Sequence, residues 1–226
     1  MSNADNGKIK IDDENIDEGC ASTGVPGIDE LTGGVKKGSI VSVVSHPLVA
    51  SDMLLKQLAY NGRETRYLTA YQEPDSFRDE VENHADGDPK FDEESRSWVT
   101  DMPDKVSGTP LDTWQDDVEN QPIDVVLEQF DVLVERLNEF SDFIFNSRSM
   151  FEDTDSVLYL HLNTGMGDFD AKQEVMLYVS DSVLVIDQDE DRNPFLSVAK
   201  LKAKESRVET KDLEISDQVE LRENPV

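Results

Sequence analysis

Few residues in this 226-residue sequence have the types and spacing that metal or redox chemistry requires. The three histidines, His46, His84 and His161, share no spacing that metal ligands use, and a single cysteine, Cys20, excludes an internal disulfide. We therefore expect no metal site. The cysteine usage fits a reducing cytoplasm, and no apolar run approaches the roughly 18 residues of a membrane span. The sequence thus predicts a cytoplasmic protein with no membrane association.

Two glycines, Gly165 and Gly167, follow an apolar run and precede a helical stretch, which is also the setting of a phosphate-binding loop. Asp170 stands where the dinucleotide-binding fingerprint has its third glycine, and the first lysine that follows is Lys172. In that fingerprint the third glycine lets the helix pack closely against the strand. We therefore interpret this segment as an ordinary strand-to-helix loop.

Basic residues are concentrated in one segment, residues 200–211, and this segment could contact nucleic acid or a protein partner. It contains Lys200, Lys202, Lys204, Arg207 and Lys211. The acidic residues Glu205 and Glu209 lie between them and dilute the positive charge. An ordinary solvated surface is therefore the favoured interpretation.

The overall charge limits the partners that the protein can have. Fifty acidic residues against 21 basic ones give a formal net charge of -29, which repels nucleic acid phosphates and anionic membranes. Such acidity is typical of disordered chains, of nucleic acid mimics and of proteins adapted to high salt. Because the carboxylates are spread through clear helix and strand patterns, we favour adaptation to high salt.

Hydrophobic periodicity predicts strands alternating with helices over most of the chain. The expected strands cover residues 39–44, 67–70, 98–99, 143–145, 157–162 and 183–186, with short strands at 195–221, and the expected helices cover 53–60, 77–83, 122–140 and 171–178. The helix at 122–140 has the clearest pattern, because its apolar residues recur every three or four positions. This order predicts an α/β fold with a mainly parallel sheet flanked by helices and an antiparallel C-terminal extension. We expect a flexible acidic leader at residues 1–20 and a single domain at 21–226.

Three ordered landmarks carry a resemblance to a known family. The run STGVPGIDEL at residues 22–31 is followed by Gly33-Gly34 and then Gly38, residues 67–77 place Glu73 just after a strand, and residues 179–186 are followed by the run LSVAKLK at 196–202. Together they resemble KaiC-like and RadA-like ATPases of the RecA superfamily. The resemblance implies a RecA-like P-loop NTPase fold, and the acidic composition suggests a halophilic archaeon as the source.

The resemblance also implies where a nucleotide would bind, and the residues there are unsuited to it. Residues 45–52 stand where a working relative has its phosphate loop, with the pattern GxxxxGK[ST]. Ser45 and Ala50 replace the glycines, Ser51 replaces the lysine and Asp52 replaces the hydroxyl residue. A carboxylate about 4 Å from a phosphate, at an effective dielectric constant near 20, costs on the order of 4 kcal/mol. We therefore expect no nucleotide binding at this loop.

The same comparison places a magnesium-orienting aspartate at the end of the strand predicted at 143–145, where this chain has Asn146. Glu73 stands where the family has its catalytic glutamate, but it equally suits the start of the helix that follows. We interpret Glu73 as a relic and expect no catalytic residues, and no ATP or magnesium as cofactors.

Three functions remain open. The favoured one is a non-catalytic, regulatory or protein-interaction domain whose partner is a protein, either an active KaiC-like relative or a second copy of the chain. The alternative is an atypical ATP-binding ATPase in signalling or DNA recombination. The last, a recombination accessory that touches DNA through residues 200–211, is disfavoured by the net charge.

Overall fold

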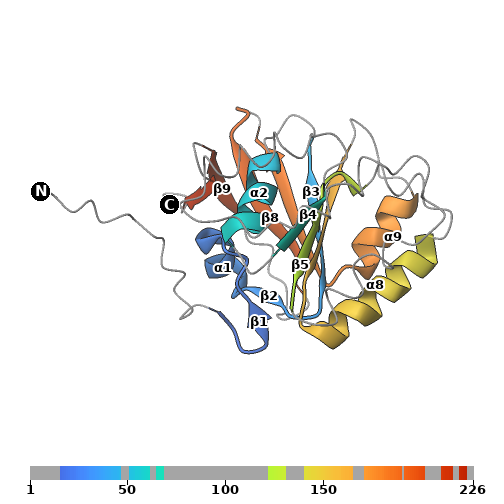
Figure 1. Ribbon diagram of the computed structural model, residues 1–226. Helices are drawn as coiled ribbons and strands as arrows, with labels where there is room; N and C mark the ends of the chain where they lie inside the picture. Colours follow the sequence, from blue (N-terminus) through green and yellow to red (C-terminus); the bar gives the residue numbers. More distant parts are fainter. Residues whose placement is uncertain are drawn as a thin grey trace, which may run out of the picture.

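The computed structural model of the chain describes residues 16–46, 51–61, 65–68, 122–130, 140–164, 171–189, 191–201, 210–215 and 219–222. These residues form an eight-stranded sheet with helices on both of its faces, as Figure 1 shows. The strand order is β10-β9-β8-β7-β3-β6-β5-β4. The predicted fold class, an α/β fold with a mostly parallel central sheet and an antiparallel extension, is confirmed.

The parallel part of the sheet has β3 at its centre. It consists of β7 (Ser182–Gln188), β3 (Ile40–Ser45), β6 (Leu158–Asn163), β5 (Asp124–Leu127) and β4 (Thr65–Leu68). The strands β8 (Pro194–Leu201), β9 (Thr210–Ile215) and β10 (Val219–Arg222) continue it in antiparallel order beyond β7. A separate ribbon pairs β1 (Cys20–Ala21) with β2 (Val35–Lys36).

Helices cover the sheet from two sides. In Figure 1, α1 (Pro26–Thr32) and α2 (Ser51–Asn61) lie on one side, and α8 (Phe140–Thr154) and α9 (Ala171–Val179) lie together on the other. Successive side chains of a strand point to opposite faces, so β3 contributes to two cores. Val41 and Val43 belong to the core that includes α1 and α2, whereas Ile40 and Val44 belong to the core beneath α8 and α9.

Most of the predicted elements in the described residues agree with the structure to within a few residues. The strands expected at 39–44, 67–70, 157–162 and 183–186 correspond to β3, β4, β6 and β7, the helices expected at 53–60 and 171–178 correspond to α2 and α9, and the expected C-terminal strands correspond to β8, β9 and β10. The predicted helix at 77–83, the strand at 98–99 and the loop at 165–167 lie outside the described residues. The single cysteine, Cys20, is free and buried.

The helix predicted from residue 122 is wrong at its start. Residues Asp124–Leu127 form strand β5, which pairs with β4 on one side and β6 on the other. All four residues are buried, because helices or loops cover both faces of a parallel strand of this kind. A strand buried on both faces shows no alternation, so its apolar residues merged with Phe130 into an apparent helical spacing.

The strand predicted at 143–145 is also wrong, because these residues lie in the first half of α8. Phe143 and Ile144 are buried while Phe145 is exposed, and Ser147 and Phe151 continue the buried side at helical spacing. Asp142 lies in the first turn of the helix. Three adjacent apolar residues fit a short strand as well as they fit a helix, and sequence alone did not separate the two.

Candidate functional site

The carboxyl edge of the parallel strands is the place where α/β sheets of this kind bind ligands. From the end of β3 the chain crosses to α2 on one face, whereas from the end of β6 it crosses to α9 on the other. Adjacent strands whose connections leave toward opposite faces open a crevice at their carboxyl ends. Ser45 ends β3 and Asn163 ends β6, and the two residues are register partners.

A closed polar cluster occupies the edge between these strands, made of Ser45, Ser51, His161 and Asn163. The Ser45 hydroxyl oxygen lies 2.8 Å from Nε2 of His161, 2.9 Å from Oγ of Ser51 and 3.3 Å from Oδ1 of Asn163. Oγ of Ser51 lies 3.3 Å from the same Nε2. Ser45, Ser51 and His161 are all buried. We call this group the strand-end cluster.

The tautomer of His161 follows from its second nitrogen. The backbone N–H of Gln129 donates to Nδ1 at 3.2 Å, so Nδ1 presents a lone pair and the proton of the neutral ring is on Nε2. Burial lowers the pKa of His161 to about 4, which keeps the ring neutral at pH 7. Nε2–H therefore donates to Ser45, and His161 cannot accept a proton from that hydroxyl. The pair is not a serine–base dyad.

Two further contacts tie the end of β3 to its neighbours. Thr164 donates to the Ser45 carbonyl from its N–H at 2.9 Å and from its hydroxyl at 3.1 Å. On the other side, the N–H of His46 donates to the Ile186 carbonyl at 3.3 Å. The backbone at the point where a phosphate loop would leave the sheet is thus held by both neighbouring strands.

Ser51 and Asp52, predicted at the lysine and hydroxyl positions, open helix α2. The Ser51 side chain is turned into the strand-end cluster, whereas Asp52 is half exposed and lies 3.7 Å from Nζ of the buried Lys56, one turn along the helix. A carboxylate in the first turn interacts favourably with the helix dipole, so Asp52 uses the positive end that an anionic ligand would otherwise occupy. Ala50 lies outside the described residues, as does Glu73.

Asn146 does not end a strand. It is an exposed residue in the middle of α8, because the predicted strand before it is part of that helix. Strand β5, two places from β3, ends at Leu127 and is followed directly by Glu128, whose Oε2 is shielded from solvent. The strand that placed Asn146 at this edge is therefore wrong, and Glu128 is a carboxylate that follows a parallel strand there.

Sequence reasoning missed Glu128, Gln129 and the role of His161. The apolar run of residues 125–127 is followed directly by Glu128, which is a signal for a carboxylate at a strand end. The prediction assigned both the run and Glu128 to the interior of a helix. Gln129 has a φ of 53°, a left-handed conformation that turns its N–H toward His161. His161 was weighed only as a metal ligand, although it lies in a strand between a serine cluster and a backbone donor.

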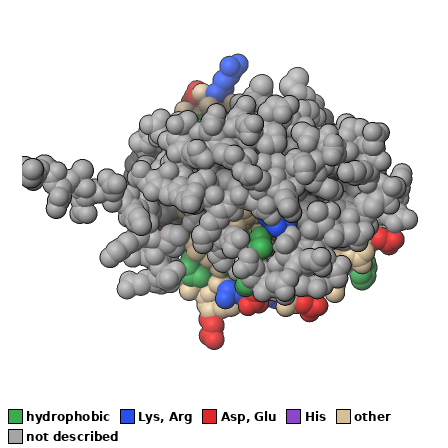
Figure 2. Space-filling view, viewed as in Figure 1, with side chains coloured by type: hydrophobic (Ala, Val, Ile, Leu, Met, Phe, Trp, Pro, Cys, Tyr) green, Lys and Arg blue, Asp and Glu red, His purple; other side chains and the backbone are tan. Residues whose placement is uncertain are grey.

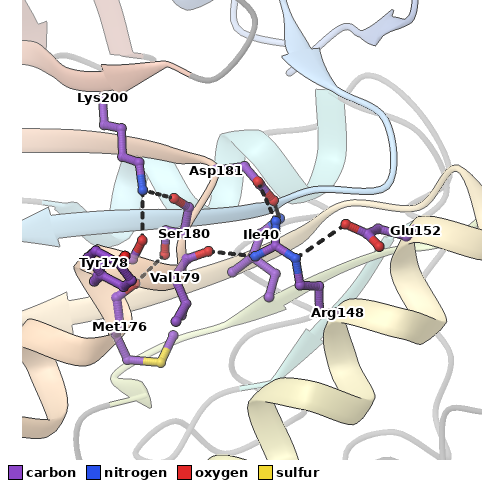
Figure 3. Close-up of polar contacts among 9 residues, drawn as sticks. All are labelled: Ile40, Arg148, Glu152, Met176, Tyr178, Val179, Ser180, Asp181 and Lys200. Atoms are coloured by element: carbon purple, nitrogen blue, oxygen red, sulfur yellow. Dashed lines mark hydrogen bonds and ion pairs between the residues drawn. The ribbon is translucent and has the colours of Figure 1, made fainter.

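The opposite, amino edge of the sheet has a second polar cluster, and it secures the end of α9 (Figure 3). Arg148 of α8 donates to the Val179 carbonyl at 2.8 Å and to Oδ1 of Asp181 at 2.7 Å. From the other side Lys200 donates to the carbonyls of Tyr178 and Ser180. Cations at a helix C-terminus satisfy its last carbonyls and favour its dipole. Lys200 of the basic segment thus has a structural role, and residues 202–209 of that segment lie outside the described part.

The described residues contain no group of three or more His, Cys, Asp or Glu side chains that could hold a metal ion. Within the same residues, no helix is both long enough and apolar enough to cross a membrane.

The order of strands and the helices on both faces define a RecA-type, KaiC-like fold. The crystal structure of a KaiC-like protein from the hyperthermophilic archaeon Pyrococcus horikoshii is similar, with a TM-score of 0.66 and 14% sequence identity, over 90% of this chain and 99% of that one. At this identity the similarity shows the fold alone. The chain belongs to the protein family DUF7125, a family of unknown function, whose model matches residues 20–224. No curated protein matches the chain.

Proposed function

We propose that this protein is a non-catalytic KaiC-like domain that acts as a regulatory or protein-interaction module. The observation that carries the proposal is the strand-end cluster, in which Ser45, Ser51 and His161 are hydrogen-bonded to one another. Before these side chains could bind a phosphate, they would have to break the hydrogen bonds that they make to one another. Each buried group that loses its partner costs about 1 to 3 kcal/mol.

Charge supports the same conclusion. Asp52 at the start of α2 is acidic, and a triphosphate brought to this edge would meet it. One such contact at about 4 Å and an effective dielectric constant near 20 costs on the order of 4 kcal/mol. Lys56 is the cation nearest in sequence to the start of α2, and it faces Asp52.

The partner of such a module would be a protein, either an active KaiC-like relative or another copy of the chain. We further propose that the protein works in the cytoplasm of an organism adapted to high salt, because carboxylates spread along the chain keep a surface hydrated and screening weakens their repulsion. The same charge makes nucleic acid an unfavourable partner.

The test is a calorimetric titration of the full chain with ATP and magnesium in molar KCl. We expect no saturable binding and no hydrolysis. Magnesium-dependent binding in the micromolar range would reject the proposal.

A matched variant, Ser51→Lys combined with Asp52→Thr, replaces the acid with a hydroxyl and adds a cation. We expect weak ATP binding to return without turnover, because Ser45 and Ala50 still deny the loop the glycines that bring its N–H groups to a phosphate. Hydrolysis by this variant would mean that the loop backbone is already competent.

An atypical ATP-binding function is the second candidate, and Glu128 favours it. A carboxylate at the end of a parallel strand, at the same edge as Ser45, is where a magnesium ion could be oriented. If the titration shows ATP binding, the Glu128→Gln variant separates the cases. Loss of the magnesium dependence in that variant would assign the ion to Glu128.

A further inference from the structure

The exposed large apolar side chains of the described residues all lie on α8 and α9. Phe145 is 80% exposed, Tyr178 is 84% exposed and Val175 is 46% exposed. A chain with a net charge of -29 has ample polar residues for these positions, so an exposed phenylalanine and tyrosine on adjacent helices are unusual. Apolar groups gathered on one face mark a binding surface more often than scattered ones do.

The three side chains lie on the solvent-facing side of two neighbouring helices, and we call this surface the α8–α9 groove. Both helices run from the carboxyl edge of the sheet to its amino edge, because each leads into a parallel strand, β6 or β7. The bond from Arg148 to the Val179 carbonyl holds them side by side. Phe145 lies about 4.5 Å back along α8 from Arg148, and Val175 about 6 Å back along α9 from Val179, at 1.5 Å per residue. Phe145 and Val175 are therefore at nearly the same level, with Tyr178 one turn from Val175 on its own helix.

The groove is rigid before any partner arrives. Arg148 bonds to Glu152 of its own helix, to Val179 at the end of α9 and to Asp181 beyond it, as Figure 3 shows. Asp181 in turn accepts from the N–H of Ile40, the first residue of the central strand. Binding to a surface whose helices are already fixed costs little ordering entropy.

Carboxylates surround the apolar centre of the groove. Asp142 lies one turn before Phe145, Glu174 precedes Val175, and Glu152 lies beyond Arg148, and all three are exposed. In Figure 2, exposed hydrophobic and acidic side chains lie together at the lower right, where Figure 1 shows α8 and α9. Arg148, which joins the two helices, is itself engaged by Glu152 and Asp181.

We propose that the α8–α9 groove binds a partner helix that has apolar side chains on one face and lysines or arginines beside them. Two-helix grooves accept amphipathic helices through anchors at helical spacing, and an acidic rim selects cationic flanks. A second copy of this chain fits poorly, because its own acidic rim would face the same carboxylates. The inference rests on the interaction role proposed above and names the chemistry of the partner.

The probe is a labelled synthetic helix with leucines on one face and lysines on the other, titrated into the full chain and followed by fluorescence anisotropy. A second helix keeps the leucines and replaces every lysine by glutamate. The titrations use two KCl concentrations at which circular dichroism shows the chain to be folded. We expect saturable 1:1 binding of the lysine helix, weaker at the higher salt, and at least roughly tenfold weaker binding of the glutamate helix.

Two pairs of variants locate the binding site. Phe145→Ser with Tyr178→Ser removes both aromatic anchors and should weaken binding at least roughly tenfold, whereas Asn146→Ala at the next residue of α8 should not. Asp142→Asn and Asp153→Asn each remove one charge from α8, but only Asp142 lies one turn from Phe145, so only its variant should weaken binding. Thermal unfolding of each variant shows whether the fold is kept.

Equal binding of the two helices, binding unaffected by the paired aromatic variant, or no binding of either helix would overturn the inference. So would a dimer in sedimentation that the aromatic variant converts to a monomer, because the occupant would then be a second copy. If the chain binds both ATP and the lysine helix, only the non-catalytic proposal is rejected. If it binds neither ATP nor the helix, only the groove proposal is rejected.

Discussion

Acidification should destabilise the protein through His161, and the sign follows from its burial. The folded-state pKa is lowered to about 4 from the ordinary 6.5. A base whose pKa is lower in the folded state contributes stability above its unfolded pKa and loses it as the pH falls through the folded value. The loss therefore begins below pH 6.5 and is complete near pH 4.

The magnitude follows from the difference of about 2.5 pH units between the two values. At about 1.36 kcal/mol per unit, protonation of His161 should remove about 3 kcal/mol of unfolding free energy, with about 2 kcal/mol already lost at pH 5. Protonation of the many carboxylates acts in the opposite direction, because it relieves repulsion in a chain of charge -29. The wild-type stability alone therefore does not isolate the effect.

The assay is the difference in unfolding free energy between the wild type and His161→Gln, from urea unfolding in molar KCl between pH 7.5 and about pH 4. Glutamine offers an amide near the position of Nε2 but does not titrate. We expect the wild-type advantage to shrink by about 3 kcal/mol across this range. A difference that stays constant with pH would refute the lowered pKa of His161 and the burial that causes it. Nitrogen NMR of the ring should independently show the proton on Nε2 at pH 7.

The other predictions concern salt, backbone and the buried Asp29. The folded state should become less stable as KCl is lowered from about 1 M to about 0.1 M, because the Debye length rises from about 3 Å to about 10 Å and the carboxylates repel one another more strongly. A circular dichroism series that stays unchanged over this range would contradict the salt explanation. Gly38→Ala should lower the free energy of unfolding more than Gly19→Ala does. Both glycines have positive φ, but only at Gly38 would a Cβ lie 2.9 Å from Cα of Glu152. Chemical unfolding of both variants measures the difference, and equal losses of unfolding free energy would count against this reasoning. Burial raises the pKa of Asp29, although bonds from Ser22 and Thr23 lower it in part, so its ionised form costs stability as the pH rises. Asp29→Asn should then stay within about 1 kcal/mol of the wild type at pH 7, whereas Asp29→Ala should lose about 2 to 3 kcal/mol by leaving the buried Thr23 donors without their acceptor, and similar stabilities for the two variants would exclude this account.

The sequence predicted the architecture well where hydrophobic periodicity was unambiguous, and failed where it was not. Strand β3 is a β-branched run bounded by Gly38 and a polar segment, and its central position follows from complete burial. Strand β5 has the same burial but lies next to Phe130, and together they imitate a helix. Phe143 to Phe145 gave the reverse error, because three apolar residues are too few to establish a period.

The candidate site was predicted at its first strand but not at the strands beside it. Ser45, Ser51 and Asp52 were identified because the family resemblance placed a phosphate loop between the first buried strand and the helix after it, and both elements are present. His161 and Gln129 join the cluster through parallel pairing and a left-handed turn, over separations of 116 and 32 residues. Such partners depend on strand order, which a single sequence does not define.

The composition of the strand-end cluster follows from the hydrogen-bond requirements of a parallel sheet. Every strand that ends at a crevice leaves polar groups that need partners, and in a ligand-binding relative the ligand and its loop can supply them. Here Thr164 donates to the Ser45 carbonyl, Nε2–H of His161 donates to the Ser45 hydroxyl, and that hydroxyl donates to Ser51. Because His161 is neutral, the exchange adds no buried charge. A single substitution of Ser51 by lysine therefore has to break these contacts before the lysine can contribute to phosphate binding. For this reason we expect the edge to stay closed to nucleotides unless several residues change together.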